Sequence, residues 1–198
     1  MSHYFDANPA SPLTTRQFEA TAFGNQLRFT TASGVFSGGR LDLGTSVLLR
    51  TVSPPDQGNI LDLGCGFGPI AVALAVASPA LRLDAVDVNQ RALDLTRLNA
   101  AGNGVDGRVN AVTPDGVPAG VAYDQIWSNP PIRIGKAALH ELLLTWLPRL
   151  KDTGTAYLVV GKNLGADSLS AWLTAQGWPT HKRASAKGFR VLATSRGI

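Results

Sequence analysis

The stretch that decides the fold is Ile60-Leu61-Asp62-Leu63-Gly64-Cys65-Gly66-Phe67-Gly68-Pro69. Its first four residues are apolar apart from one acid, which predicts a short buried strand. The three glycines permit a sharp turn, and the apolar run that starts at Pro69 predicts a helix, because proline loses no hydrogen bond in a first turn. Such a turn lets a ligand approach the backbone, and the helix N-terminus favours a negative group.

The spacing of this loop excludes two common nucleotide sites. The glycines follow G-x-G-x-G, with Asp62 two residues before the first of them, whereas dinucleotide sites show G-x-G-x-x-G and phosphate loops end in a lysine. About 20 residues further on, a strand over 81–87 ends in Asp87, the place where an acid accepts hydrogen bonds from ribose hydroxyls. A glycine turn that only packs helix on strand is the plain alternative. Together the two features predict an adenosine-bearing ligand whose other end is not a pyrophosphate.

These residues resemble the class I S-adenosylmethionine-dependent methyltransferases. In that family the D-x-G-x-G-x-G loop wraps the methionine end of the cofactor, and the acid ending the second strand binds the ribose. The resemblance implies S-adenosyl-L-methionine as cofactor. The cofactor-binding residues that it implies are Asp62, Gly64, Cys65, Gly66, Gly68, Asp87, Val88, Thr113 and Asn129.

Length and composition predict one domain over residues 1–198. The chain is 44% hydrophobic, has one cysteine and carries a formal net charge of +4. A single cysteine excludes an intramolecular disulfide, and neither a secretion signal nor a membrane-length apolar run is present, so we expect a cytoplasmic protein. The three histidines lack metal-ligand spacing, which predicts no metal site. The modest basic excess suits a nucleic-acid partner and equally an ordinary solvated surface.

The order of the predicted elements favours an α/β fold with a doubly wound sheet. An N-terminal arm and a β-hairpin around Gly24-Asn25 occupy residues 1–40, and a catalytic core follows over 41–198. Expected strands are 18–23, 26–31, 60–63, 81–87, 108–112, 123–128, 155–160, 178–185 and 189–194. The first expected helix starts at Asp42 or Thr45, and four further helices are expected over 69–77, 90–101, 136–150 and 165–175. Alternation of strand and helix predicts a seven-stranded, Rossmann-like parallel sheet that ends in an antiparallel hairpin.

The chemical end of the site is predicted at Asn129-Pro130-Pro131, directly after the fourth core strand. Ligands of open parallel sheets bind at that edge. The prolines remove two N–H donors, which leaves carbonyl acceptors beside the Asn129 amide. An acceptor on Asn129 and the Pro130 carbonyl would orient a planar exocyclic amine toward a sulfonium methyl group. Transfer then needs alignment and desolvation rather than a strong base.

This loop resembles the N-P-P-[YFW] motif of methyltransferases that act on adenine N6, guanine N2 or a glutamine amide. The loop, the Gly34-Val35-Phe36-Ser37 and Leu41–Thr45 segments and Gly188–Leu192 resemble the methyltransferase small domain family over about residues 3 to 195. That family includes the 16S ribosomal RNA guanine-N2 methyltransferases, which are similar to two such domains in tandem. The resemblance implies ribosomal RNA or the small ribosomal subunit as partner.

Two positions depart from the family pattern. Ile132 stands where the motif has an aromatic residue, so we expect base stacking from elsewhere, with Phe36 as the candidate and a core role for Phe36 as the alternative. The acid that the family places after the third strand is replaced by Thr113 or by Asp115. Cys65 lies inside the glycine loop, and this position argues against a thiolate attack on a pyrimidine.

Substrate binding is assigned to Phe36, Ile132, Arg133 and Lys136. Four further cations, Arg28, Arg40, Lys187 and Arg190, are expected on the rims of the pocket, where phosphates beside an extruded base would lie. The predicted function is methylation of guanine N2 in 16S ribosomal RNA. Alternatives are methylation of a protein glutamine amide or of adenine N6, and a non-catalytic RNA-binding module.

Overall fold

A computed structural model describes residues 14–35 and 39–197 of the protein. The strands are β1 (Thr15–Ala22), β2 (Asn25–Ala32), β3 (Gln57–Leu63), β4 (Ala80–Val86), β5 (Val109–Val112), β6 (Tyr123–Ser128), β7 (Leu150–Gly161), β8 (Thr180–Ala186) and β9 (Phe189–Ser195). The helices are α1 (Leu43–Thr51), α2 (Pro69–Ala77), α3 (Gln90–Gly102), α4 (Lys136–Trp146) and α5 (Ala166–Ala175). Short 3₁₀ turns are η1 (Pro114–Gly116), η2 (Ile132–Ile134), η3 (Leu147–Arg149) and η4 (Lys162–Leu164).

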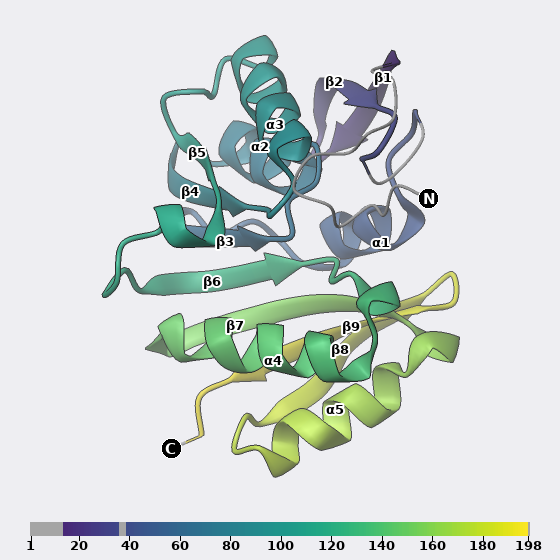
Figure 1. Cartoon of the computed structure of the whole chain (residues 1–198), viewed down its shortest axis with the longest axis vertical. Helices are drawn as coiled ribbons and strands as arrows, with labels where there is room; N and C mark the ends of the chain where they lie inside the picture. Colours follow the sequence, from purple (N-terminus) through teal and green to yellow (C-terminus); the bar gives the residue numbers. More distant parts are fainter. Residues whose placement is uncertain (1–13, 36–38, 198) are drawn as a thin grey trace.

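The main sheet has seven strands in the order β5-β4-β3-β6-β7-β9-β8 (Figure 1). Neighbours from β5 to β7 pair parallel, whereas β9 pairs antiparallel with both β7 and β8. The predicted doubly wound sheet with a C-terminal antiparallel hairpin is confirmed. The hairpin is antiparallel because the two-residue turn between β8 and β9 is too short for a crossover helix.

Alternate residues of the inner strands of the main sheet enter two separate cores, one on each face of the sheet. Ile60 packs in the first core and Leu61 in the second. Buried residues of α1, α2 and α3 belong to the first core, and those of α4 and α5 belong to the second. In Figure 1, α4 and α5 lie over the front of the sheet. The period of two along β3 therefore explains why its sequence is apolar on both faces.

The N-terminal hairpin of β1 and β2 is a separate two-stranded sheet that packs on α2 and α3 (Figure 1). Phe18 and Phe29 lie edge-on to Phe67 of the glycine loop, with ring centroids 5.9 and 5.7 Å away. The turn is centred on Phe23-Gly24, which have φ of 50° and 79°, and not on Gly24-Asn25 as the sequence indicated. Asn25 instead donates its side-chain N–H to the Phe23 carbonyl at 3.1 Å. This core, shared by hairpin and sheet, supports the proposal of one domain over 1–198.

Two boundaries differ from the sequence-based expectation by four residues or more. Helix α4 ends at Trp146 rather than near 150, because Pro148 lacks the N–H that a continuing helix needs. Strand β7 begins at Leu150 rather than at 155, and residues 151–154 form a register irregularity inside it. Gly154 makes this possible, since a Cβ there would lie 3.0 Å from the Lys151 carbonyl oxygen. Along the described part of the chain, every helix is too short or too polar to cross a membrane.

Candidate active site

The glycine loop is fastened to the neighbouring strand at its first two residues. The N–H groups of Gly64 and Cys65 both donate to the Val86 carbonyl, at 2.8 and 3.0 Å. The loop ends at Gly68, which caps α2 with a φ of 84°. A Cβ at Gly68 would lie 2.8 Å from Thr96 Cγ2, so the close approach of α3 also requires glycine here.

Asp87 lies at the carboxyl end of β4 and is half-buried. Its Oδ2 accepts the Gly66 N–H at 2.9 Å, and its Oδ1 accepts the Asn89 N–H at 2.9 Å. Burial raises the pKa of the Asp87 carboxyl, although the N–H groups of Asn89, Gly66 and Val88 oppose the rise. Each oxygen retains acceptor capacity, so the carboxylate is both an anchor for the loop and a site for hydroxyl donors.

Asp62 lies fully buried beneath the loop. Its Oδ2 accepts the Ala71 N–H of α2 at 3.0 Å, whereas its Oδ1 is buried and has no hydrogen-bond partner among the described residues. Burial raises the pKa of Asp62 to about 7, the bond from Ala71 opposes the rise, and the Asp87 charge adds to it. A buried carboxylate oxygen without a partner suits a nearby cation.

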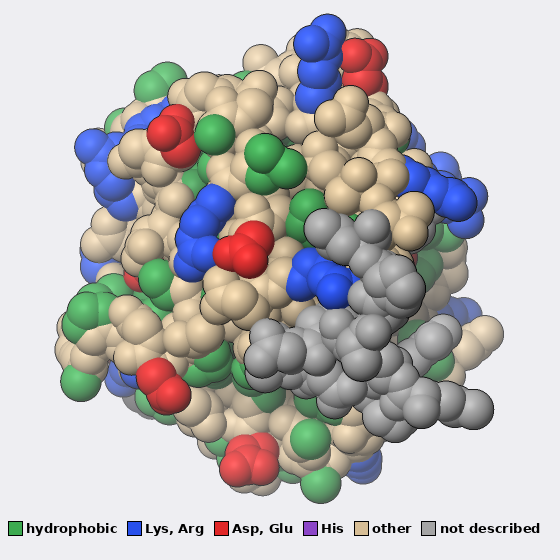
Figure 2. All heavy atoms as spheres, turned by 45° about the horizontal axis from the view of Figure 1, so that its top comes forward, with side chains coloured by type: hydrophobic (Ala, Val, Ile, Leu, Met, Phe, Trp, Pro, Cys, Tyr) green, Lys and Arg blue, Asp and Glu red, His purple; other side chains and the backbone are tan. Residues whose placement is uncertain are grey.

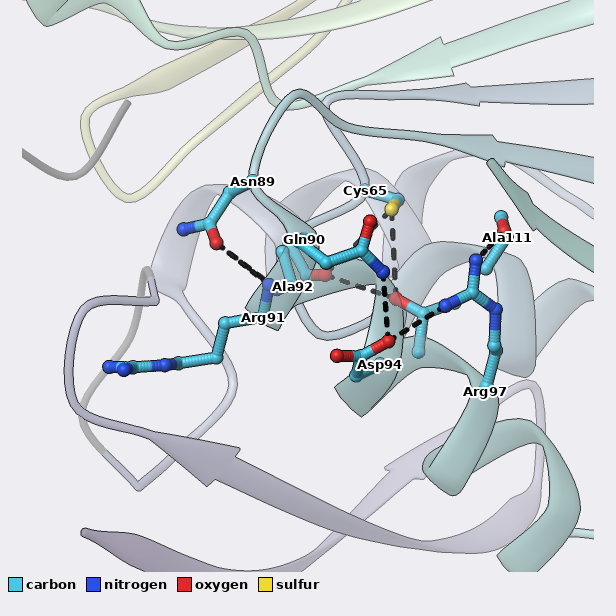
Figure 3. A network of polar contacts seen from close by, with 10 residues as sticks. Cys65, Asn89, Gln90, Arg91, Ala92, Asp94, Arg97 and Ala111 are labelled. Atoms are coloured by element: carbon cyan, nitrogen blue, oxygen red, sulfur yellow. Dashed lines mark hydrogen bonds and ion pairs between the residues drawn. The ribbon is translucent and has the colours of Figure 1, made fainter. Parts of the chain in front are cut away.

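The start of α3 holds a second segment beside Asp87. The Asn89 side chain caps the helix by accepting from Arg91 N and Ala92 N, as Figure 3 shows in part. Its Nδ2 also donates to the Gly34 carbonyl at 3.0 Å, and Arg91 donates to the Ser33 carbonyl at 2.7 Å. The segment 33–34, which leads into the predicted Phe36 loop, is thus fixed next to the predicted ribose acid.

The predicted chemical loop lies against the glycine loop. Ser128 donates its hydroxyl to the Leu63 carbonyl at 2.7 Å, which joins the ends of β6 and β3. An ideal Cβ on Gly64 would lie 3.9 Å from Pro131 Cδ. Pro131 has φ −74° and ψ 76°, an inverse γ-turn, and within it the Pro130 carbonyl accepts Ile132 N–H at 2.8 Å. That carbonyl keeps one lone pair for a further donor.

Asn129 is half-buried and bonded to the start of α1. Its Nδ2 donates to Asp42 Oδ2 at 2.8 Å and to Thr45 Oγ1 at 3.1 Å. Asp42 Oδ2 also accepts the N–H groups of Gly44 and Thr45, at 2.8 and 3.2 Å, and so caps α1. The sequence indicated a helix start at Asp42 or Thr45, and the cap settles it at Asp42.

Three other residues assigned to the cofactor take different positions. Val88 is 46% exposed beside Asp87, an apolar surface suited to an aromatic base. Thr113 directly follows Val112, the register partner of Val86, so Thr113 lies next to Asp87, and Asp115 lies farther along in η1. Cys65 offers only its backbone, because its side chain is buried against Thr96 Oγ1 at 3.6 Å, and burial raises the thiol pKa.

The predicted substrate residues are only partly described. Phe36 and the Arg133 side chain lie outside the described residues. Ile132 is partly buried against the second core, and Lys136 is exposed at the first turn of α4. Arg190 does not point to the rim, because Phe189 faces α1 and alternation turns Arg190 toward Asp167 of α5, with which it forms an ion pair.

Three predicted rim cations remain, and Arg40 is exposed just before the Asp42 cap of α1. Arg28 does not contact the predicted rim; it forms an ion pair with Glu19 on the N-terminal hairpin, at 3.1 Å. Lys187 is exposed in the β8–β9 turn, and Lys162 follows β7 beside it, its N–H donating to the Gly188 carbonyl at 2.8 Å. The sequence did not indicate Lys162 as a rim cation. It reaches this position because β7 continues beyond Leu158, the residue paired with the end of β6.

Four polar residues without a predicted role in the site connect its parts. They are Asp42, Thr45, Ser128 and Thr96, whose hydroxyl donates to the Gly66 carbonyl at 3.0 Å. The only sequence signal was the spacing of Asp42 before Thr45, typical of a helix N-cap. No group of three or more His, Cys, Asp or Glu side chains in the described ranges is arranged to hold a metal ion.

Comparison with known proteins agrees with this geometry. The family described as Methyltransferase small domain matches residues 26–193. The chain is 33% identical over 170 residues to the uncharacterized protein YbxB of Bacillus subtilis (strain 168), covering 84% of each chain. It is 32% identical over 202 residues to Ribosomal RNA small subunit methyltransferase C of Pseudomonas entomophila (strain L48), covering 100% of this chain and 59% of that relative.

One solved structure has the same fold with a TM-score of 0.81 at 22% identity, over 95% of this chain and 52% of that one. It is the T. thermophilus 16S rRNA N2 G1207 methyltransferase (RsmC) in complex with AdoMet and guanosine. The chain spans just over half the length of these two named methyltransferases. Because the family match covers most of the sequence and both sequence motifs, the chain belongs to the methyltransferase small domain family.

Proposed function

We propose that the protein transfers a methyl group from S-adenosylmethionine to the exocyclic N2 amine of a guanine in small-subunit ribosomal RNA. The observation that carries this proposal is that the Asn129-Pro130-Pro131 loop starts beside the glycine loop, because the Ser128 hydroxyl donates to the Leu63 carbonyl at 2.7 Å. It brings an amide acceptor to the edge of the sheet where the predicted adenosine site lies. The named relatives add the substrate class, because one is a ribosomal RNA methyltransferase and another is bound to AdoMet and guanosine.

The residues present fit S-adenosylmethionine. Asp87 offers acceptor capacity for ribose hydroxyls, and Val88 offers an exposed apolar surface for the adenine. Asp62, buried with an unpaired oxygen, favours positive charge above the glycine loop. When bound, the cofactor supplies an electrophilic methyl group: the N–C bond forms as the S–C bond breaks with its electrons on sulfur, and the amine then loses one proton to water.

The protein's own part in the reaction is orientation. Asn129 Oδ1 and the second lone pair of the Pro130 carbonyl are acceptors for the two N–H groups of a planar amine. Binding both hydrogens directs the nitrogen lone pair out of the ring plane, toward the methyl group. No described side chain is placed as a strong base, and none is needed while the amine proton leaves after methyl transfer.

The test is methylation by the purified full chain with methyl-labelled S-adenosylmethionine on small ribosomal subunits and on deproteinised 16S RNA. We expect N2-methylguanosine as the labelled nucleoside by mass spectrometry. Label in N6-methyladenosine or in a glutamine-bearing peptide would replace the proposal with one of its alternatives. Absence of transfer from a chain that binds both cofactor and RNA would favour a non-catalytic binding module.

Asn129→Ala separates chemistry from binding in the same assay. If the amide acts mainly in the transition state, kcat should fall roughly 100- to 1,000-fold while the Kd for S-adenosylmethionine stays near the wild-type value. The matched control is Asn110→Ala, an exposed Asn on β5 that donates to Asp84 away from this loop. A wild-type rate for the Asn129 variant would end the acceptor mechanism.

A further inference from the structure

Both donors of the Asn129 amide are already used within the protein. Nδ2 donates to the Asp42 carboxylate at 2.8 Å and to the Thr45 hydroxyl at 3.1 Å, and both acceptors belong to the start of α1. Oδ1 has no hydrogen-bond partner among the described residues. The amide therefore has a bonded side toward α1 and an open acceptor side.

This orientation has one stable state. An ionised carboxylate only accepts hydrogen bonds, so the atom of Asn129 that faces Asp42 must be the NH₂ group. Rotating the amide by half a turn would place Oδ1 against the carboxylate oxygen, where two acceptors repel each other, and would leave Asp42 without this donor. The acidic partner thus decides which end of the amide meets the substrate.

The two acceptors are themselves held rigidly. The same Asp42 oxygen caps α1 by accepting from Gly44 N and Thr45 N, and Thr45 is buried. A Cβ on Gly44 would lie 3.0 Å from both Asp42 Oδ2 and Phe189 Cε1, so β9 packs directly behind the cap. A helix end backed by a central strand keeps a site more closely in place than a loop would.

We propose that Asp42 and Thr45 are positioning residues for methyl transfer, which hold Asn129 so that Oδ1 faces the target amine. This inference rests on the proposed catalytic role of Asn129. As the amine nitrogen shares its lone pair with the incoming methyl carbon, its hydrogens become more positive and their bond to Oδ1 strengthens. The Asp42 carboxylate is bonded to the other end of the amide and raises the electron density of Oδ1, which strengthens this hydrogen bond in the transition state. The effect belongs to the transition state and so to kcat.

Two substitutions remove the positioning bonds while keeping the helix. Asp42→Ser retains a good N-cap but is one bond shorter, so it withdraws the acceptor from Asn129. Thr45→Val keeps the shape and removes the hydroxyl. We expect kcat to fall roughly 10- to 100-fold for Asp42→Ser and about 3- to 10-fold for Thr45→Val, with the Kd for S-adenosylmethionine and the KM for RNA near wild type.

A matched control and a rescue variant distinguish a loss of amide positioning from a general loss of structure in α1. Thr51→Val removes a hydroxyl from the other end of α1, where it donates to the Val47 carbonyl at 2.8 Å, and should leave kcat unchanged. Thr45→Ser restores the hydroxyl and should recover most of the rate lost in Thr45→Val. Equal losses in Thr51→Val and Thr45→Val, or a rise in KM without a fall in kcat, would overturn the proposal.

A double-mutant cycle tests whether Asp42 acts through Asn129. In an Asn129→Ala background, adding Asp42→Ser should change kcat by less than about 2-fold, because no amide is left to orient. An equal loss of kcat in both backgrounds would show that Asp42 works independently of Asn129, and would overturn the proposal.

A last measurement needs no substrate. In ¹H–¹⁵N spectra, the two side-chain NH₂ protons of Asn129 should exchange slowly with water and shift on Asp42→Ser. Freely exchanging protons in the wild-type protein would overturn the proposed orientation. The NMR measurement does not depend on turnover, so it tests the orientation of the Asn129 amide by itself. A wild-type rate for Asn129→Ala would instead reject the acceptor mechanism of the proposed function.

Discussion

At the scale of single residues, two carboxylates near the glycine loop have different surroundings. Asp87 is half-buried and receives backbone N–H groups on both oxygens, whereas Asp62 is fully buried and one of its oxygens has no partner among the described residues. Burial raises the pKa of both, to about 7 for Asp62. Asp87 is therefore placed to contact a ligand directly, and Asp62 to act through its charge.

Replacing Asp87 by Ala should weaken binding of S-adenosylmethionine. The ribose hydroxyls would lose their acceptor and the Gly66 N–H would lose its partner, a cost of about 1–3 kcal/mol or roughly 5- to 150-fold in Kd. Isothermal calorimetry measures this. Asp94→Ala is the control, since Asp94 is an exposed acid of α3 bonded to Gln90 and Arg97 (Figure 3). Equal affinities for the two variants would place the ribose elsewhere.

Asp62 should make the stability of the cofactor-free protein fall as pH rises. Its pKa is about 7 when folded and near its ordinary 3.8 when unfolded, so between these values the folded state binds more protons. The free energy of unfolding then decreases from about pH 4 to about pH 7, by up to the order of 4 kcal/mol, and is level above that. Asp87 adds to the slope in the same direction.

Asp62→Asn removes this titration, and urea unfolding at pH 5, 6 and 8 measures the result. The unfolding free energy of the variant relative to wild type should rise from pH 5 to about pH 7 and then level off, whatever its absolute sign. The Asp87 contribution is present in both proteins and largely cancels in the difference. A difference that stays constant across the three pH values would contradict the raised pKa of Asp62.

At the scale of elements, the packing of α2 against α3 determines the loop between β3 and α2. Gly68 begins α2 in a left-handed conformation, and Thr96 of α3 lies where its Cβ would be. The Thr96 hydroxyl bonds to the Gly66 carbonyl at 3.0 Å, and Asn99 donates to the Phe67 carbonyl at 2.8 Å. Helix α3 thus holds three successive positions of the glycine loop in place.

Gly68→Ala should destabilise the protein by roughly 2–4 kcal/mol, from the left-handed φ and the 2.8 Å contact with Thr96 Cγ2. Gly102→Ala is the matched control, because nothing lies within 4 Å of its Cβ and the residue is helical. That change should be neutral or stabilising by up to about 1 kcal/mol. Chemical denaturation measures both, and similar values would show that the α2–α3 contact carries no strain.

At the scale of the whole molecule, exposed lysines gather at the carboxyl edge of the sheet. Lys136, Lys162 and Lys187 come from three separate segments there, and none of them forms an ion pair with another described residue. On the face seen in Figure 2, by contrast, visible Lys and Arg side chains lie apart, some beside an acid. Cations beside the Asn129 loop suit the phosphates of an RNA whose base enters the site.

Replacing Lys136, Lys162 and Lys187 together by Gln should weaken RNA binding and flatten its salt dependence. Each lysine that contacts a phosphate contributes roughly 0.7–0.9 to the slope of log K against log salt, so we expect a reduction of about 2–3. Fluorescence anisotropy with a 16S RNA fragment measures it. Lys151→Gln is the control, since Lys151 pairs with Asp124 at the opposite end of β7. An unchanged slope of log K against log salt for the triple variant would show that these lysines do not contact the RNA.

The sequence by itself determined the fold and both loops of the site, because the responsible interactions are local. Strand periodicity, the glycines before Pro69 and the prolines after Asn129 act over a few residues, and Asp62 and Asp87 end successive strands whose carboxyl ends meet in a parallel sheet. The same local reasoning placed the final hairpin. Where it failed, at the Phe23-Gly24 turn, at the end of α4 and at the start of β7, the error was five residues or fewer.

Only the tertiary structure decided how the site is held together. Asp42 and Asn129 are 87 residues apart, and nothing in either segment indicates that a helix cap would accept the amide of a distant loop. Arg190 looks like a rim cation in the sequence, yet the alternation of β9 turns it to Asp167. Such contacts depend on which face each strand presents and on which helix end the chain brings there. That choice is made by packing of the whole sheet, which no local pattern encodes.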